Sequence, residues 1–189
     1  QILLAMHVSI ILSTYNNPEW LEKVLWGIEM QSYKDFEVVI ADDGSGDETK
    51  QLIERFQNET ELSIQHCWHE DNGFKKCQIL NIATVAAKGE YLIFTDGDCV
   101  PRTDFIATHV QHSEPRHFLS GGYCKLPMGL SKLISKDDII SGRAFDISWL
   151  KENGLKSFSS CLKLGLTNPW TKVADKLTST KPTWNGCNA

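Results

Sequence analysis

Short apolar runs rich in β-branched residues alternate with stretches of helical periodicity through the first half of this 189-residue chain. The runs lie at 7–12, 36–41, 62–68 and 91–95. The first is continuous, as expected for a strand that is buried on both faces of a parallel sheet. Strand and helix alternate three times, which implies right-handed βαβ units. The sequence therefore predicts an α/β fold with a mostly parallel central sheet flanked by helices.

The segments between these strands carry helix signals. Asn17 and Pro18 predict the N-cap and first residue of one helix, and Asp47 predicts the cap of the next. Gly89 is expected at the C′ position of the third. We expect helices from Pro18 onward, after Asp47, at 75–88 and at 101–112. A further strand is expected at 118–124.

The pattern loosens after about residue 126. Apolar residues between Ser131 and Leu164 follow no single period, and we expect one or two amphipathic helices over the binding face. A membrane-surface helix is the alternative, but no dense basic face accompanies these residues. We therefore divide the chain into an α/β half, 1–125, and a helical, loop-rich region, 126–189.

Composition limits the function classes. The net charge is −5, from 24 acidic and 19 basic residues, which argues against a nucleic-acid-binding surface. The six cysteines include no Cys-x-x-Cys pair, so we expect reduced thiols in a cytoplasmic protein and neither a disulfide framework nor structural zinc. We find no bilayer-spanning run and no signal peptide. Because the chain begins at Gln1 and stops at Ala189 without a helix stop, we expect a fragment.

Two carboxylates, Asp96 and Asp98, directly follow the last of the four predicted strands. Ligands bind at the carboxyl edge of open α/β sheets, where three further loops should converge: 13–16, 42–45 and 71–76. Together the four loops contain hydroxyls, an aromatic ring, a carboxylate, lysines and an acidic pair. These groups suit a nucleotide diphosphate with Mn²⁺ or Mg²⁺. The sequence therefore predicts a nucleotide site at this edge.

Each element also has a simpler interpretation. Asp-Gly is a common turn signal, and Asp42 with Asp43 could be a turn plus a cap. Lysines at a helix start are usually solvated, although they oppose the helix dipole and so favour a nearby anion. Two histidine pairs, 66 with 69 and 109 with 112, could suggest zinc, but packed or solvated histidines are the better interpretation.

Four blocks of the chain resemble family 2 glycosyltransferases of the GT-A fold, as found in bacterial polysaccharide synthesis. They are VSIILSTYNNPEWLEKVLWGI, FEVVIADDGSGDETKQLI, NGFKKCQILNIA and KGEYLIFTDGDCVP. Their order and separation agree with that family over about the first 110 residues, a far more specific signal than Asp-x-Asp alone. The segment from Trp184 to Ala189 resembles the family's acceptor-side Gly-Cys-Asn block, cut off within it.

The resemblance implies roles for individual residues. Ser13 and Tyr15 would line the base pocket, Asp43 would bind the base edge, and Asp96 would contact the ribose or the waters of the metal. Asp98 would ligate Mn²⁺ or Mg²⁺. The other residues so implied are Lys76 and Asn81 on the donor side and Trp184, Gly186 and Asn188 on the acceptor side. The family's arginine before Asn81 is Leu80 here, a departure for which Lys75 or Lys76 could substitute.

The implied activity is inverting transfer of a sugar from a nucleotide-diphosphate sugar, with UDP favoured, to a glycan or lipid-linked acceptor hydroxyl. Such a reaction needs a carboxylate base, which in the family lies after the Gly-Cys-Asn block and so beyond Ala189. The aspartates before that block match no base motif. The resemblance also implies a cytoplasmic protein that associates peripherally with the inner face of the membrane.

Three other function classes compete with this one. A sugar-phosphate nucleotidyltransferase should carry a glycine-rich loop after the first strand, where residues 13–17 contain no glycine. A phosphoacceptor signalling domain needs an acidic pair after the first strand, where this chain has Ser-Thr-Tyr-Asn. A dinucleotide oxidoreductase is excluded because no Gly-x-Gly-x-x-Gly follows a predicted strand.

Overall fold

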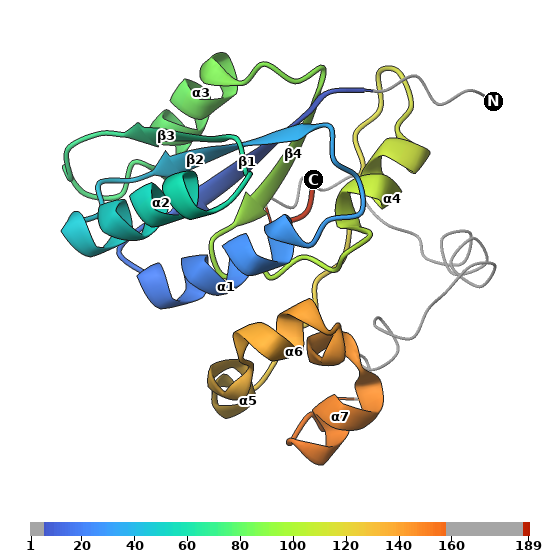
Figure 1. The fold of residues 1–189 in the computed structure, drawn as a ribbon. Helices are drawn as coiled ribbons and strands as arrows, with labels where there is room; N and C mark the ends of the chain where they lie inside the picture. The colour runs from blue at the N-terminus through green and yellow to red at the C-terminus, as the bar shows by residue number, and fades with distance from the viewer. Residues whose placement is uncertain (1–5, 158–186) are drawn as a thin grey trace.

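Four parallel strands form one sheet in the order β3-β2-β1-β4 (Figure 1). The computed structural model describes residues 6–157 and 187–189. The strands are β1 (Val8–Thr14), β2 (Phe36–Asp42), β3 (Ile64–Trp68) and β4 (Tyr91–Asp96). The predicted α/β fold with a parallel sheet is confirmed.

The position of β1 sets the geometry of the sheet. All seven of its residues are buried, and it pairs with β2 on one side and β4 on the other. Ser13 is thereby in register with Ala41 of β2 and with Asp96 of β4. Because parallel strands end at the same edge, the loops after β1, β2 and β4 start side by side.

Helices cover both faces of the sheet (Figure 1). Leucine, isoleucine and valine side chains of α1 (Pro18–Glu29), α2 (Asp47–Glu59) and α4 (Phe105–His112) pack on one face. The other face is covered by α3 (Lys76–Ala86), through Ile79 and Ala83. A strand buried on both faces requires continuous apolar character, which explains the uninterrupted run of β1.

Two of the predicted helix ends are wrong. Gly46, not Asp47, is the N-cap of α2, where its N–H donates to Asn16 Oδ1. Gly89 is not the C′ residue of α3, which ends at Ala86 with an extended Ala87 as its C-cap. Gly89 lies against β1 instead, where its N–H donates to Ser9 Oγ at 2.8 Å. A Cβ on Gly89 would lie 2.4 Å from the Ser9 nitrogen, so this close approach requires glycine.

The strand predicted at 118–124 is also wrong, because this segment is irregular. It forms no ladder with any of the four strands of the described sheet. Instead, the Gly121 N–H donates to the Asn188 carbonyl, and Asn188 Nδ2 donates to the Gly122 carbonyl. Two adjacent glycines weaken strand propensity, and the bonds to Asn188, which is distant in the sequence, take the place of sheet pairing.

Short helices follow: α5 (Met128–Leu133), α6 (Lys136–Ile140), the 3₁₀ helix η1 (Arg143–Phe145) and α7 (Ile147–Glu152). We expected one or two amphipathic helices over the binding face. The structure instead packs α6 on α1, on the side away from the sheet (Figure 1). The buried Lys23 of α1 donates to the carbonyls of Ser131 and Lys132, which ties α5 to the same helix. No helix in the described parts of the chain is both long and apolar enough to span a membrane.

The contact between Gly89 and β1 can be tested by adding one methyl group. We expect Gly89→Ala to lower the free energy of unfolding by about 2 kcal/mol, because the new Cβ must displace backbone of the central strand. Gly122→Ala is the control, since a Cβ there meets nothing within 4 Å. Urea unfolding of both variants measures the effect, and equal stabilities would contradict the close approach.

Candidate functional site

Asp96 stands at the centre of the predicted site. It is the last residue of β4, and its Oδ1 accepts two hydrogen bonds, from Ser13 Oγ at 2.7 Å and from Lys76 Nζ at 2.6 Å. Ser13 comes from the neighbouring strand and Lys76 from the first turn of α3. Ser13, Lys76 and Asp96, all predicted to bind the nucleotide-sugar donor, thus come together. The Lys76 ammonium lies beside the Asp96 carboxylate, and Asp96 Oδ2 takes part in neither hydrogen bond.

The turn after Asp96 presents Asp98 to solvent. The Gly97 N–H donates to the Ser13 carbonyl at 2.8 Å, and the Cys99 N–H donates to the Asp96 carbonyl at 3.0 Å. A Cβ on Gly97 would lie 2.9 Å from the Ser13 oxygen, so only glycine fits here without a shift. Asp98 is exposed, and its Oδ1 receives a thiol contact from Cys99 at 3.4 Å. The motif is therefore a fixed turn with one outward carboxylate.

The two adjacent aspartates after β2 differ in environment. Asp42 is completely buried, where Oδ1 accepts from the Ser45 N–H at 2.8 Å and Oδ2 bonds His66 Nε2 at 2.9 Å. Burial alone would raise the pKa of Asp42, but the bonds from His66 and Ser45 outweigh it and lower the pKa. Asp42 therefore has a structural role in the turn.

Asp43 reaches the segment that leads into α3. Its Oδ1 bonds His69 Nε2 at 2.8 Å, and its Oδ2 accepts from the Lys75 N–H at 3.0 Å. These contacts join the loop after β2 to the loop after β3. The sequence placed Asp43 at the site but did not reveal His66 and His69 as partners of the two aspartates. These two contacts depend on the parallel pairing of β2 with β3, which puts Asp42 beside Trp68 and which no local pattern of the sequence reports.

Tyr15 stands half exposed at the same edge. Its hydroxyl donates to Asp71 Oδ2 at 2.9 Å, and this bond raises the pKa of Tyr15. Asp71 Oδ1 also accepts from the Gly73 N–H at 3.0 Å. The backbone of Asp71 packs against Gly44, whose φ of +95° and short contacts both require glycine. Asp71 lies in the predicted loop 71–76, but the sequence did not reveal its bond to Tyr15.

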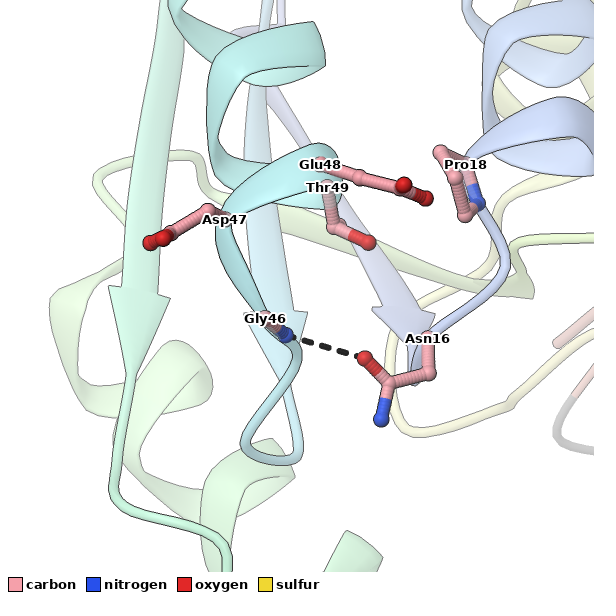
Figure 2. A pocket seen from close by; sticks show the side chains of 6 residues that line it. All are labelled: Asn16, Pro18, Gly46, Asp47, Glu48 and Thr49. Carbon is pink, nitrogen blue, oxygen red and sulfur yellow. Dashed lines mark hydrogen bonds between the residues drawn. The ribbon is translucent and has the colours of Figure 1, made fainter.

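A shallow pocket opens beside this cluster, between the first turns of α1 and α2 (Figure 2). Asn16 adopts a left-handed φ of 44°, and its Oδ1 accepts from the Gly46 N–H at 2.9 Å. The lining residues are Asn16, Pro18, Gly46, Asp47, Glu48 and Thr49. None of them is a predicted donor-site residue, so the pocket adjoins the predicted site without coinciding with it.

The carboxylates at this edge fit a hard divalent cation. Mn²⁺ and Mg²⁺ prefer oxygen ligands and usually keep several waters. Asp98 offers an exposed carboxylate, and Asp96 retains Oδ2 outside its bonds to Ser13 and Lys76. The donor set is thus suited to such an ion bound through one or two carboxylates.

The remaining predicted residues within the described part of the chain take no part in the hydrogen bonds around Asp96. Asn81 is exposed on α3, and the adjacent Leu80 packs against the apolar cluster under that helix. The side chain of Asn188 contacts His109 Nε2 through Oδ1 and the Gly122 carbonyl through Nδ2. Trp184 and Gly186 lie outside the described residues.

Comparisons with known proteins find similar sequences and a similar solved structure. A model of the glycosyl transferase family 2 matches residues 9–121, more than half of the chain. Over 95 residues the chain is 33% identical to the poly(ribitol-phosphate) β-N-acetylglucosaminyltransferase TarS of Staphylococcus aureus, covering 49% of this chain and 16% of that protein. Over 149 residues it is 29% identical to the GalNAc(5)-diNAcBac-PP-undecaprenol β-1,3-glucosyltransferase of Campylobacter jejuni, covering 73% and 47%.

One solved structure shares the fold at 30% sequence identity and a TM-score of 0.52. It is the mannosyltransferase PcManGT from Pyrobaculum calidifontis in complex with GDP-Man and Mn²⁺. The match covers 58% of this chain and 33% of that one. This chain therefore spans less than half the length of each of these three proteins.

The buried Asp42 should influence how stability depends on pH. Its folded-state pKa lies below the ordinary 3.8, so its stabilising contribution is complete above that value and is lost as pH falls through the folded-state pKa. We expect Asp42→Asn to cost about 1–3 kcal/mol at pH 7 and to flatten the acid-induced loss of stability below pH 4.

The control for this variant is Asp47→Asn, at an exposed carboxylate in the first turn of α2. Urea unfolding between pH 2 and pH 7 compares the two variants with the unaltered chain. An Asp42→Asn curve parallel to that of the unaltered chain would contradict the assigned bonds.

Proposed function

This chain belongs to glycosyl transferase family 2, and on that premise we propose that it binds a nucleotide-diphosphate sugar at the carboxyl edge of its sheet. The observation that carries this is the meeting of Ser13, Lys76 and Asp96, followed by the exposed Asp98. A cation, a hydroxyl and two carboxylates lie there, where α/β sheets bind ligands. Family membership favours sugar transfer over nucleotidyl transfer or a phosphoacceptor role.

The donor nucleotide contacts four elements in this proposal. The half-exposed ring of Tyr15 stacks on the base, held by its bond to Asp71. Asp43 accepts a hydrogen bond from the base edge. Ser13 and Asp96 receive the ribose, and Lys76 offsets the charge of the diphosphate. Asn81, exposed on α3, completes the donor set.

Asp98, with Asp96, would hold Mn²⁺ or Mg²⁺, consistent with the Mn²⁺ and GDP-Man in the PcManGT complex. When bound, such an ion stabilises the negative charge that develops on a departing diphosphate. The turn fixed by Gly97 sets the backbone position from which the Asp98 carboxylate extends, before any ligand arrives. Preorganised charge of this kind lowers the cost of rearrangement during reaction.

The reaction we propose is a single displacement with inversion. The acceptor hydroxyl oxygen bonds the anomeric carbon as that carbon's bond to the diphosphate oxygen breaks, and the hydroxyl proton passes to a carboxylate base. We assign this base to no described residue. In this proposal residues 1–125 bind the donor, and residues 126–189 form part of the acceptor side. The acceptor-side residues include Trp184, Gly186 and Asn188.

We further propose UDP as the preferred nucleotide and a glycan or lipid-linked hydroxyl as the acceptor, in cell-surface polysaccharide synthesis. Two relatives support this acceptor class, because their names specify a poly(ribitol-phosphate) for TarS and a glycan linked to undecaprenol for the Campylobacter jejuni glucosyltransferase. An acceptor of that kind favours a cytoplasmic enzyme associated peripherally with the inner face of the membrane.

Nucleotide binding provides the first test. We expect UDP with Mn²⁺ to raise the Tm of the chain in a thermal-shift assay, because a ligand that binds only the folded state stabilises it by mass action. GDP and dTDP, each with and without Mn²⁺, are the matched comparisons. If no nucleoside diphosphate raises Tm under any metal condition, the donor site is not where we place it.

Asp98→Ala tests the metal end of the site. We expect the variant to fold normally, because the side chain is exposed. It should lose at least about tenfold in Mn²⁺-dependent UDP affinity, because such an ion is held by only one or two carboxylates and the substitution removes one of them. Asp137→Ala, at an exposed carboxylate on α6, is the control and should bind as the unaltered chain does. Isothermal calorimetry measures both, and undiminished binding by Asp98→Ala would overturn the assigned role.

A further inference from the structure

Two cysteines far apart in the sequence meet beside Asp96. Within residues 6–157 and 187–189, Asp96, Cys99 and Cys187 are the one group of three potential ligand residues whose ligand atoms all lie within 4.8 Å of one another. All three side chains are partly buried. The cysteines are scattered along the sequence, and only the fold brings this pair together.

Hydrogen bonds to β4 hold both cysteines in place. The Cys99 N–H donates to the Asp96 carbonyl at 3.0 Å, in the turn that follows the strand. On the other side, Thr95 Oγ1 donates to the Cys187 carbonyl at 3.2 Å. Ala189 and Phe94 exchange two backbone bonds, of 2.7 and 3.3 Å, which seat the carboxyl-terminal residues along β4 (Figure 1). The end of the strand thus positions all three ligands.

We propose that Asp96, Cys99 and Cys187 form a binding site for a divalent cation that accepts thiolate ligands, such as Zn²⁺. Around tetrahedral zinc, with Zn–S of about 2.3 Å and Zn–O of about 2.0–2.2 Å, ligand atoms lie roughly 3–4 Å apart. Side-chain adjustments of an ångström or so therefore bring these three atoms into the coordination sphere. Each thiol releases its proton to solvent as its sulfur binds the metal, and a water takes the fourth position.

The chemistry separates this site from the one at Asp98. Mn²⁺ and Mg²⁺ select oxygen ligands, whereas two sulfurs and one carboxylate select a softer ion. Asp96 belongs to both groups, so the two ions compete for one carboxylate. A thiolate-bound ion would then weaken Mn²⁺-dependent nucleotide binding, a consequence that rests on the proposed function, although the site itself does not.

Cobalt titration of the reduced 189-residue chain tests the site without any nucleotide. Co²⁺ is a spectroscopic substitute for zinc, and cobalt–thiolate bonds give intense near-ultraviolet absorption. We expect this band to saturate at one Co²⁺ per chain and to disappear when Zn²⁺ is added. If the unaltered chain shows no such band, there is no site.

Serine variants identify the ligands. Cys99→Ser and Cys187→Ser should each lose most of the band and bind Co²⁺ at least tenfold more weakly, with folding checked by circular dichroism. Cys77→Ser is the matched control, because Cys77 is exposed on α3, and it should bind as the unaltered chain does. Full binding by folded Cys99→Ser and Cys187→Ser, or an equal loss in Cys77→Ser, would overturn the assignment.

Asp98→Ala distinguishes this site from the proposed Mn²⁺ site. The cobalt band should persist in that variant, because Asp98 is not among the three ligands, and its loss in a folded protein would contradict a separate site. Failure of every nucleoside diphosphate to stabilise the chain would count against the proposed function alone. Absence of the cobalt band would count against the thiolate site alone.

Discussion

The parallel pairing of β1 with both of its neighbours is the constraint on which the rest of the structure depends. A central strand buried on both faces must be apolar throughout, and its register then determines which residues emerge together at the carboxyl edge. Ser13 pairs with Asp96 because of that register, not because either residue attracts the other over a distance. The hydrogen bond between them uses a proximity that the sheet already provides.

Sequence reasoning located the four strands because continuous apolar runs and turn residues are local signals. It failed at 118–124, where two adjacent glycines and the bonds to Asn188 prevent ladder formation. It also misjudged Gly89, because glycine at a helix end and glycine at a close approach look alike in a sequence. The Ser9 contact that requires this glycine comes from a residue 80 positions away.

The candidate site was predictable in outline and not in its internal bonding. Loops after parallel strands converge by topology, so Ser13, Asp43 and Asp96 could be grouped from the sequence. The pairing of His66 with Asp42 and of His69 with Asp43 could not, because it depends on the placement of the third strand and of the loop after it.

Hydrogen bonding decides where a cation could bind at this edge. Asp42, Asp43 and Asp71 each have both carboxylate oxygens bonded to histidine, tyrosine or backbone N–H groups. Replacing such bonds with a metal ion would leave buried or constrained donors unpaired, at a cost of about 1–3 kcal/mol each. Asp96 keeps one oxygen outside its bonds, and Asp98 has only a long thiol contact. Of these five aspartates, the chain's own bonds leave Asp96 and Asp98 with a carboxylate oxygen for a cation.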